Sequence, residues 1–176
     1  MTSSSRALIV IDPQNDYFPG GKYPLWNTEA TLANIEQAIL RARSLEIPVV
    51  LVQHIADASR GIAPFFNAGS PGVEIHPCVR TAAPDAPVVV KSFADSFHHT
   101  LLEETLHGLG VEELLLCGMM TQNCVTHTAL SKSAEKYQVT ILPECCTTVD
   151  QMIHRIALNA LSTRVMLLPA PEALAV

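Results

Sequence analysis

Short, continuous runs of apolar residues alternate with helix-like segments along the chain, and this alternation limits the fold more than any other feature. Runs that are rich in β-branched residues and lack polar interruptions are typical of parallel strands buried on both faces. We predict six such strands, over residues 7–11, 48–55, 88–90, 113–117, 139–142 and 165–168. The spacing of apolar residues and the capping residues predict four helices, over residues 28–45, 96–107, 123–136 and 150–161.

Strands that alternate with helices form right-handed crossover units, and a series of them builds a doubly wound sheet. We therefore expect a Rossmann-like α/β fold in a single domain, residues 1–176, with about six mostly parallel strands and helices on both faces. Residues 56–87 contain many Gly and Pro residues and no sustained periodicity. A long irregular segment inside a compact domain often carries function.

The composition narrows the class of protein further. The chain is 48% hydrophobic and 16% charged, which favours a packed interior over disorder. A net charge of -6 with only 11 Lys and Arg residues argues against nucleic acid or an anionic membrane as a partner. The polar residues 1–6, the lack of a long apolar stretch and five cysteines without disulfide-scaffold spacing predict a cytoplasmic protein with reduced thiols.

Polar residues follow three of the predicted strands directly. They are Asp12, Lys91 and the turn over residues 118–124, which ends in Cys124. In open α/β sheets ligands bind outside the carboxyl ends of the strands, so we expect these groups to share one edge. A helix N-terminus at Cys124 and a nearby Lys91 would both lower the pKa of the thiol. Asp12 could then act as general acid and base.

These roles combine into one mechanism. Cys124 would attack a carbonyl carbon, the backbone N–H groups of Met120 and Cys124 would stabilise the oxyanion, and water would hydrolyse the resulting thioester. Each residue also has an ordinary explanation, because Asp before Pro forms turns, Lys at a strand end is usually solvated and Cys is often buried. A nucleotide-binding module is disfavoured, since Asp12-Pro13 stands where a glycine-rich phosphate loop would begin.

Three ordered motifs resemble those of the isochorismatase-like cysteine hydrolases, a family that includes nicotinamidases, N-carbamoylsarcosine amidohydrolases and isochorismatases. The motifs are DPQNDYF at 12–18, KSFADSF at 91–97, and GMMTQNCV at 118–125 followed by Thr128-Ala129. The resemblance extends over nearly the whole chain and implies the isochorismatase-like hydrolase fold.

The resemblance also implies a set of site residues. The family's catalytic Asp, Lys and Cys fall on Asp12, Lys91 and Cys124, and a cis peptide between Met119 and Met120 is expected beside the oxyanion hole. Four further residues match positions that line or support the family's substrate pocket: Gln14, Tyr17, Phe18 and Phe93. For the aromatic residues, and for Phe93 above all, core packing is the alternative. The family also implies a homo-oligomer, a dimer or tetramer, that acts on a small molecule.

Departures from the family patterns bear on the substrate. Nicotinamidases hold a metal through an Asp-x-His element that residues 52–57 lack, so we expect no metal, no cofactor and a substrate other than nicotinamide. Isochorismatases do not need the cysteine, so Cys124 favours cleavage of an amide or carbamoyl C–N bond. A vinyl ether hydrolase and a catalytically silent interaction protein are the alternatives. Cys145 and Cys146 could form a redox switch or simply pack in the core.

Overall fold

The structure of the protein is a computed structural model that describes residues 5–175; both ends of the predicted domain, residues 1–4 and 176, lie outside the described part. One parallel sheet with the order β3-β2-β1-β4-β5-β6 forms its centre. The strands are β1 (Arg6–Ile11), β2 (Val49–His54), β3 (Val88–Lys91), β4 (Glu113–Met119), β5 (Gln138–Thr147) and β6 (Met166–Leu167). The predicted α/β fold with six parallel strands is confirmed.

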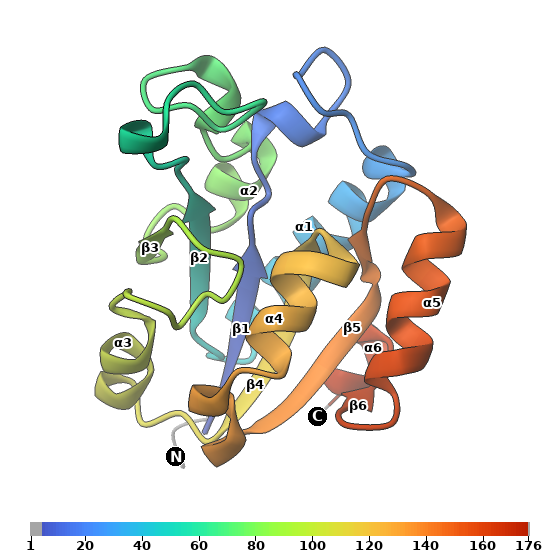
Figure 1. Cartoon of the computed structure of the whole chain (residues 1–176). Coiled ribbons are helices and arrows are strands. Elements are labelled where there is room, and N and C mark those ends of the chain that lie inside the picture. The colour runs from blue at the N-terminus through green and yellow to red at the C-terminus, as the bar shows by residue number, and fades with distance from the viewer. Residues whose placement is uncertain (1–4, 176) are drawn as a thin grey trace.

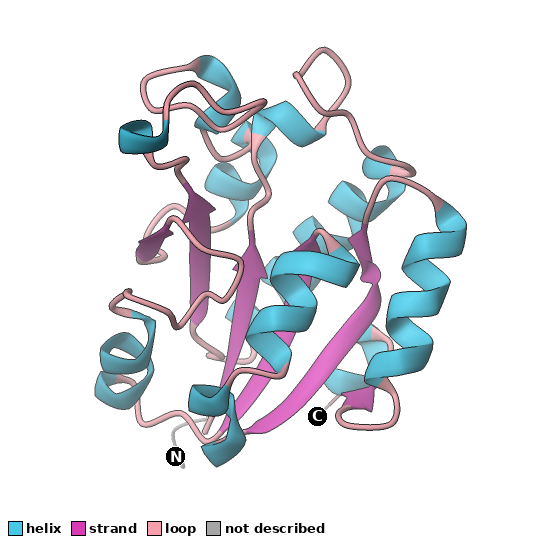
Figure 2. Cartoon of the chain, viewed as in Figure 1, coloured by secondary structure: helices cyan, strands magenta, loops and turns pink. Residues whose placement is uncertain are grey.

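Helices cover both faces of this sheet (Figures 1 and 2). They are α1 (Thr28–Ser44), α2 (Pro77–Ala82), α3 (Leu102–Gly108), α4 (Thr126–Ala129), α5 (Gln151–Leu161) and α6 (Ala170–Ala173). In Figure 1, α1 lies behind the sheet and α4 lies in front of it. Within residues 5–175, no helix is both long and apolar enough to span a bilayer.

β1 lies in the interior of the sheet and of the core. Its residues 7–11 have no exposed surface, because β2 and β4 pair with its two edges and helices cover both faces. From β1 the chain builds outward through β2 to β3 and then crosses to β4 on the other side. The strand order therefore reverses between β1 and β4, and such a switch point is where doubly wound sheets bind ligands.

Two predicted helices are shorter than the sequence pattern suggested. The helix predicted over 96–107 begins only at Leu102, because His99 has a left-handed φ of +54°, which interrupts a right-handed helix. Ser96 bonds to Thr128 instead: the Ser96 N–H donates to Thr128 Oγ1 at 3.0 Å, and the Thr128 hydroxyl donates to Ser96 Oγ at 2.8 Å. The helix predicted over 123–136 is divided into a π turn (Thr121–Val125), α4 and a 3₁₀ turn (Lys132–Lys136).

Two other segments are more ordered than expected. The strand predicted over 139–142 extends as β5 from Gln138 to Thr147, which places Cys145 and Cys146 inside a buried strand as free thiols. The segment over 56–87 contains α2 and two 3₁₀ turns, Ala58–Arg60 and Pro71–Val73. These short elements fold the segment over the carboxyl ends of β1 and β2, where the Gln14 side chain bonds to Val73.

Gly118 lies at the switch point, opposite Ile11 of β1. Its φ is +122°, and a Cβ added there would lie 2.0 Å from the Ile11 carbonyl oxygen. We expect Gly118→Ala to push β1 and β4 apart and to lower the free energy of unfolding by roughly 4 kcal/mol, measured by chemical denaturation.

Gly110 provides the matched control for this substitution. Its φ is also positive, +65°, but no heavy atom lies within 4 Å of an added Cβ. Gly110→Ala should therefore cost only the left-handed backbone conformation, about 1 kcal/mol. Equal losses in the two variants would contradict the close approach of β4 to β1 as the reason for glycine at position 118.

Candidate active site

Asp12, Lys91 and Cys124 lie at the carboxyl ends of three different strands. Asp12 follows β1 with a φ of +50°, Lys91 is the last residue of β3, and Cys124 belongs to the π turn that follows β4. The arrowheads of β1 and β2 point to this edge, at the top of Figure 1. The sheet topology therefore delivers all three side chains to the region of the switch point.

The ammonium group of Lys91 joins the other two side chains. Nζ donates to Asp12 Oδ2 at 2.8 Å and to Cys124 Sγ at 3.3 Å. The side chains of Lys91 and Asp12 have no exposed surface, and Cys124 is 3% exposed. The structure thus brings together the three residues that the sequence predicted at separate strand ends, inside a buried ion pair.

His54 is a fourth member of this cluster that the sequence analysis did not assign to the site. It ends β2, opposite Lys91 in the strand register, and its Nδ1 lies 2.9 Å from Lys91 Nζ. The signal was available, because His54 is also the polar residue at the end of a buried strand, as Asp12 and Lys91 are. The order of the strands, which puts β2 between β1 and β3, is what brings it to Lys91.

The charges of the cluster follow from burial and from the neighbouring groups. Burial opposes the charged form of Lys91, but Asp12 and Cys124 beside it raise the pKa of the ammonium above its usual value. Burial and the Asp12 carboxylate raise the pKa of the Cys124 thiol, and Lys91 opposes them only in part. The prediction of a lowered thiol pKa is therefore wrong for the resting protein, since desolvation outweighs the nearby ammonium.

One carboxylate oxygen of Asp12 has no hydrogen bond within the described residues. Its Oδ2 accepts from Lys91, whereas Oδ1 is buried and has no hydrogen-bond partner among residues 5–175. A carboxylate oxygen of Asp12 lies within 4.8 Å of Cys124 Sγ. A buried, unpartnered carboxylate oxygen is costly for the fold, and here it is available to take a proton from a neighbouring donor.

The turn that precedes Cys124 contains a cis peptide bond between Met119 and Met120. The Met120 carbonyl accepts hydrogen bonds from the N–H groups of Asn123 at 3.0 Å and Val125 at 3.3 Å. Neither of these bonds uses the N–H of Cys124. The assignment of the Met120 and Cys124 N–H groups to an oxyanion hole stays a prediction.

The predicted substrate residues have different surroundings. Gln14 is fully buried and bonds only to backbone: Nε2 donates to the carbonyls of His54 and Val73, both at 2.7 Å, and Oε1 accepts from the His54 N–H at 2.8 Å. This amide fixes the end of β2. Phe93 is 41% exposed, and the contact it makes with the cluster is through its carbonyl, which accepts from Lys91 at 3.1 Å.

The two remaining predicted substrate residues, Tyr17 and Phe18, are buried aromatic residues. The Tyr17 ring packs edge-on against Phe66 at 4.6 Å, and Phe18 packs against the His76 ring at 4.5 Å. Burial, with Asp12 and Cys124 nearby, raises the pKa of the Tyr17 hydroxyl. Tyr17 therefore lies within electrostatic reach of the cluster. Substrate binding by any of the four residues remains a prediction.

Metal-ligand atoms of Asp12, His54 and Cys124 all lie within 4.8 Å of one another. Lys91 Nζ is within hydrogen-bond distance of the same three side chains, at 2.8, 2.9 and 3.3 Å. A metal ion bound by these groups would be placed against the ammonium, which already supplies the positive charge among them. The residues of the cluster therefore do not fit a metal ion.

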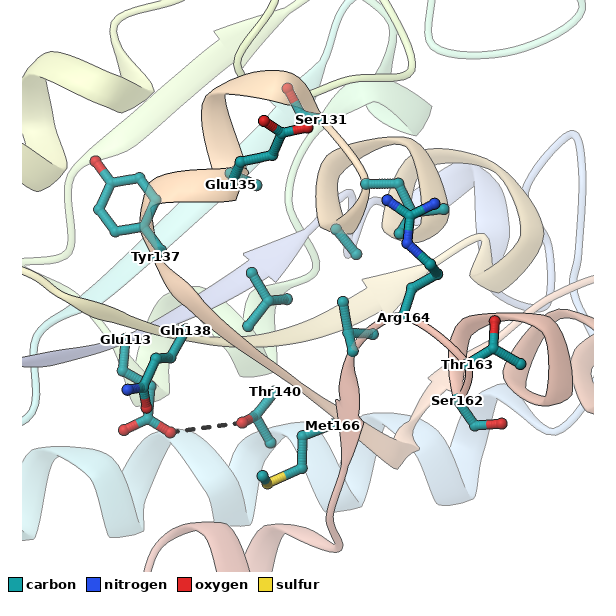
Figure 3. A pocket seen from close by; sticks show the side chains of 15 residues that line it. Glu113, Ser131, Glu135, Tyr137, Gln138, Thr140, Ser162, Thr163, Arg164 and Met166 are labelled. Atoms are coloured by element: carbon teal, nitrogen blue, oxygen red, sulfur yellow. Dashed lines mark hydrogen bonds between the residues drawn. The ribbon is translucent and has the colours of Figure 1, made fainter.

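A large pocket lies at the opposite edge of the sheet (Figure 3). Its volume is about 680 Å³, and Glu113, Tyr137, Gln138 and Arg164 are among the residues that line it. Glu113 and Gln138 are the first residues of β4 and β5, so this pocket faces the amino ends of the strands. It is separate from the Lys91 cluster, which lies at the carboxyl ends.

Comparison with known proteins agrees with this fold and motif set. The model of the isochorismatase domain matches residues 6–168. The isochorismatase family protein YddQ of Bacillus subtilis is 40% identical over 150 residues, which cover 85% of this chain and 82% of YddQ. The nicotinamidase/pyrazinamidase of Mycobacterium tuberculosis is 28% identical over 142 residues, 70% of this chain and 76% of that protein.

A solved structure extends the similarity to three dimensions. The isochorismatase hydrolase of Oleispira antarctica superposes with a TM-score of 0.88 at 33% identity, and the match covers 100% of both chains. The protein is therefore a hydrolase whose single α/β domain has the isochorismatase-like fold. It belongs to the isochorismatase family.

Proposed function

We propose that the protein is a cysteine-dependent hydrolase that cleaves a C–N bond of amide or carbamoyl type in a small molecule. The observation that carries the proposal is the position of Lys91 Nζ, 2.8 Å from Asp12 Oδ2 and 3.3 Å from Cys124 Sγ in a buried site. A thiol, a base and a cation at these distances are what nucleophilic attack on a carbonyl requires. The M. tuberculosis relative is named for hydrolysis of amides, which agrees with this chemistry.

In the proposed mechanism Asp12 moves the protons. Its free Oδ1 takes the thiol proton as Cys124 attacks the carbonyl carbon, and Lys91 stabilises the negative charge that develops on the sulfur. Collapse of the tetrahedral intermediate breaks the C–N bond, and Asp12 returns the proton to the leaving nitrogen. Water then attacks the thioester, Asp12 accepts a proton from it, and that proton goes back to the Cys124 sulfur as the acid leaves.

Burial explains why the resting thiol stays protonated in this scheme. The raised pKa of Cys124 disfavours a free thiolate in the empty site, so proton transfer to Asp12 accompanies attack instead of preceding it. Asp12, Lys91 and Cys124 are each at most 3% exposed, which favours a small substrate that displaces water on binding. The Met120 and Cys124 N–H groups are our candidates for the oxyanion hole.

The proposal also covers the oligomeric state, location and partners of the enzyme. We infer a homo-oligomer, a dimer or tetramer, located in the cytoplasm. The exposed apolar side chains Val88 and Val90 on edge strand β3, 38% and 49% exposed, support association. The expected partner is a small-molecule substrate, with no nucleic acid and no membrane.

Ammonia release from a panel of primary amides and carbamoyl compounds tests the reaction class. We expect turnover of at least one compound in the panel, at a rate proportional to enzyme concentration. Isochorismate is assayed in parallel as the substrate of the alternative reaction. Hydrolysis of isochorismate alone, with no ammonia from any amide, would contradict C–N cleavage and favour a vinyl ether hydrolase.

A further inference from the structure

Lys91 has more acceptors around its ammonium group than protons to give them. An ammonium group carries three N–H bonds and no acceptor. Four acceptor atoms surround Nζ: Asp12 Oδ2 at 2.8 Å, His54 Nδ1 at 2.9 Å, the Phe93 carbonyl oxygen at 3.1 Å and Cys124 Sγ at 3.3 Å. One of the four must therefore be left without a full hydrogen bond at any moment.

The sulfur is the weakest competitor for these protons. The Asp12 carboxylate is charged and accepts most strongly, and both the imidazole nitrogen and the carbonyl oxygen are better acceptors than a neutral thiol. Cys124 Sγ also lies farthest from Nζ. In the resting protein Asp12, His54 and Phe93 therefore take the larger share of the three Lys91 protons, and the hydrogen bond to Cys124 Sγ is the weakest of the four.

His54 Nδ1 can accept a hydrogen bond from Lys91 only when the imidazole is neutral and carries its proton on Nε2. Burial and the Lys91 ammonium lower the pKa of His54, against a smaller opposing effect of Asp12, so the ring is neutral near pH 7. The charged and titratable groups around it are Lys91 on β3, Asp12 after β1 and Cys124 after β4. The ring also faces Phe66 at 5.9 Å.

The backbone of His54 is fixed as well as its ring. Gln14 accepts from the His54 N–H at 2.8 Å and donates to its carbonyl at 2.7 Å. These two bonds to one side-chain amide lock the end of β2 against the segment after β1. The distance from His54 Nδ1 to Lys91 is therefore set by the sheet edge, and the imidazole is held where it can accept the ammonium proton.

We infer that His54 is a positioning residue that draws one N–H of Lys91 away from Cys124, so that the sulfur gains a full hydrogen bond from Lys91 only when the His54 contact is released. The inference rests on the proposed role of Cys124 as nucleophile. It makes the acceptor at position 54 a control on thiol reactivity.

The test is the pH dependence of Cys124 alkylation by iodoacetamide in three proteins: wild type, His54→Gln and His54→Leu. Peptide mapping by mass spectrometry follows Cys124, and the partly exposed Cys78 serves as an internal reference for the reagent. In His54→Leu a Lys91 proton is released to the sulfur. At a pH below the midpoint of the wild-type alkylation profile, we therefore expect Cys124 to be alkylated about tenfold faster in this variant than in the wild type. His54→Gln keeps an acceptor oxygen and should retain the wild-type profile.

The sign of the shift separates this role from a structural one. A leucine that merely fills the space would desolvate the thiol further and move the profile to higher pH. Identical profiles in the three proteins, or a move to higher pH in His54→Leu, would overturn the inference alone. Absence of Cys124 alkylation in all three proteins at every pH would also overturn the inference, because release of the His54 contact would then not activate the sulfur. The proposed nucleophile is judged separately, by ammonia release from wild type and Cys124→Ala. His54→Met replaces the leucine variant if thermal unfolding shows that it does not fold.

Discussion

Lys91→Met is expected to lower the free energy of unfolding by about 3–5 kcal/mol. The substitution leaves the fully buried Asp12 carboxylate without the ammonium that lies 2.8 Å from it. An uncompensated buried charge costs far more than the lost hydrogen bond. The pKa of Lys91 is raised in the folded protein. The Asp12–Lys91 ion pair therefore stabilises the fold fully below the ordinary Lys pKa of about 10.4, and this stabilisation is lost as the pH rises through the raised pKa of Lys91. Denaturant unfolding at pH 7 measures the difference.

Two further variants separate charge from packing. The double variant Asp12→Asn/Lys91→Met removes both charges, so it should recover most of the lost stability while remaining inactive. Lys136→Met breaks an exposed pair with Glu103 on the protein surface and should change stability very little. If the double variant were as unstable as Lys91→Met, packing of the lysine side chain would explain the loss and the ion pair would not.

Cys124→Ala is expected to reduce the rate of ammonia release by roughly 10⁴-fold or more, because it removes the only protein atom that bonds to the substrate carbon in the proposed mechanism. Asp12 and Lys91 keep their ion pair in this variant, so unfolding should change much less than activity. Cys78→Ala is the matched control, since Cys78 lies in α2, outside the Lys91 cluster, and is only partly buried. Activity on amides that survives Cys124→Ala would contradict covalent catalysis by Cys124.

Much of the fold could be predicted because buried parallel strands leave a strong local signal. The run over residues 7–11 is wholly apolar because β1 is buried on both faces and paired on both edges. The helix predicted over 96–107 begins late because the backbone is left-handed at His99, and Ser96 makes a distant contact instead. Ser96 bonds to Thr128, thirty-two positions away, and no local pattern contains that information.

The candidate site could be predicted residue by residue but not as a geometry. Asp12, Lys91 and Cys124 could be named from the strand ends and from the family motifs. The place of His54 depends on β2 lying between β1 and β3, which the apolar runs do not encode. The direction of the Cys124 pKa shift depends on how deeply the thiol is buried, so a sequence that shows a lysine and a helix nearby favours the wrong sign.

Covalent catalysis by Cys124 is decided by the mass of the Cys124 peptide after rapid acid quench during turnover of an amide that releases ammonia. We expect an acyl adduct on the peptide that contains Cys124, with the mass of the substrate minus ammonia. The adduct should appear within one turnover and be absent from Cys124→Ala. Steady ammonia release with no adduct on Cys124 at any quench time, together with full activity of Cys124→Ala, would contradict it.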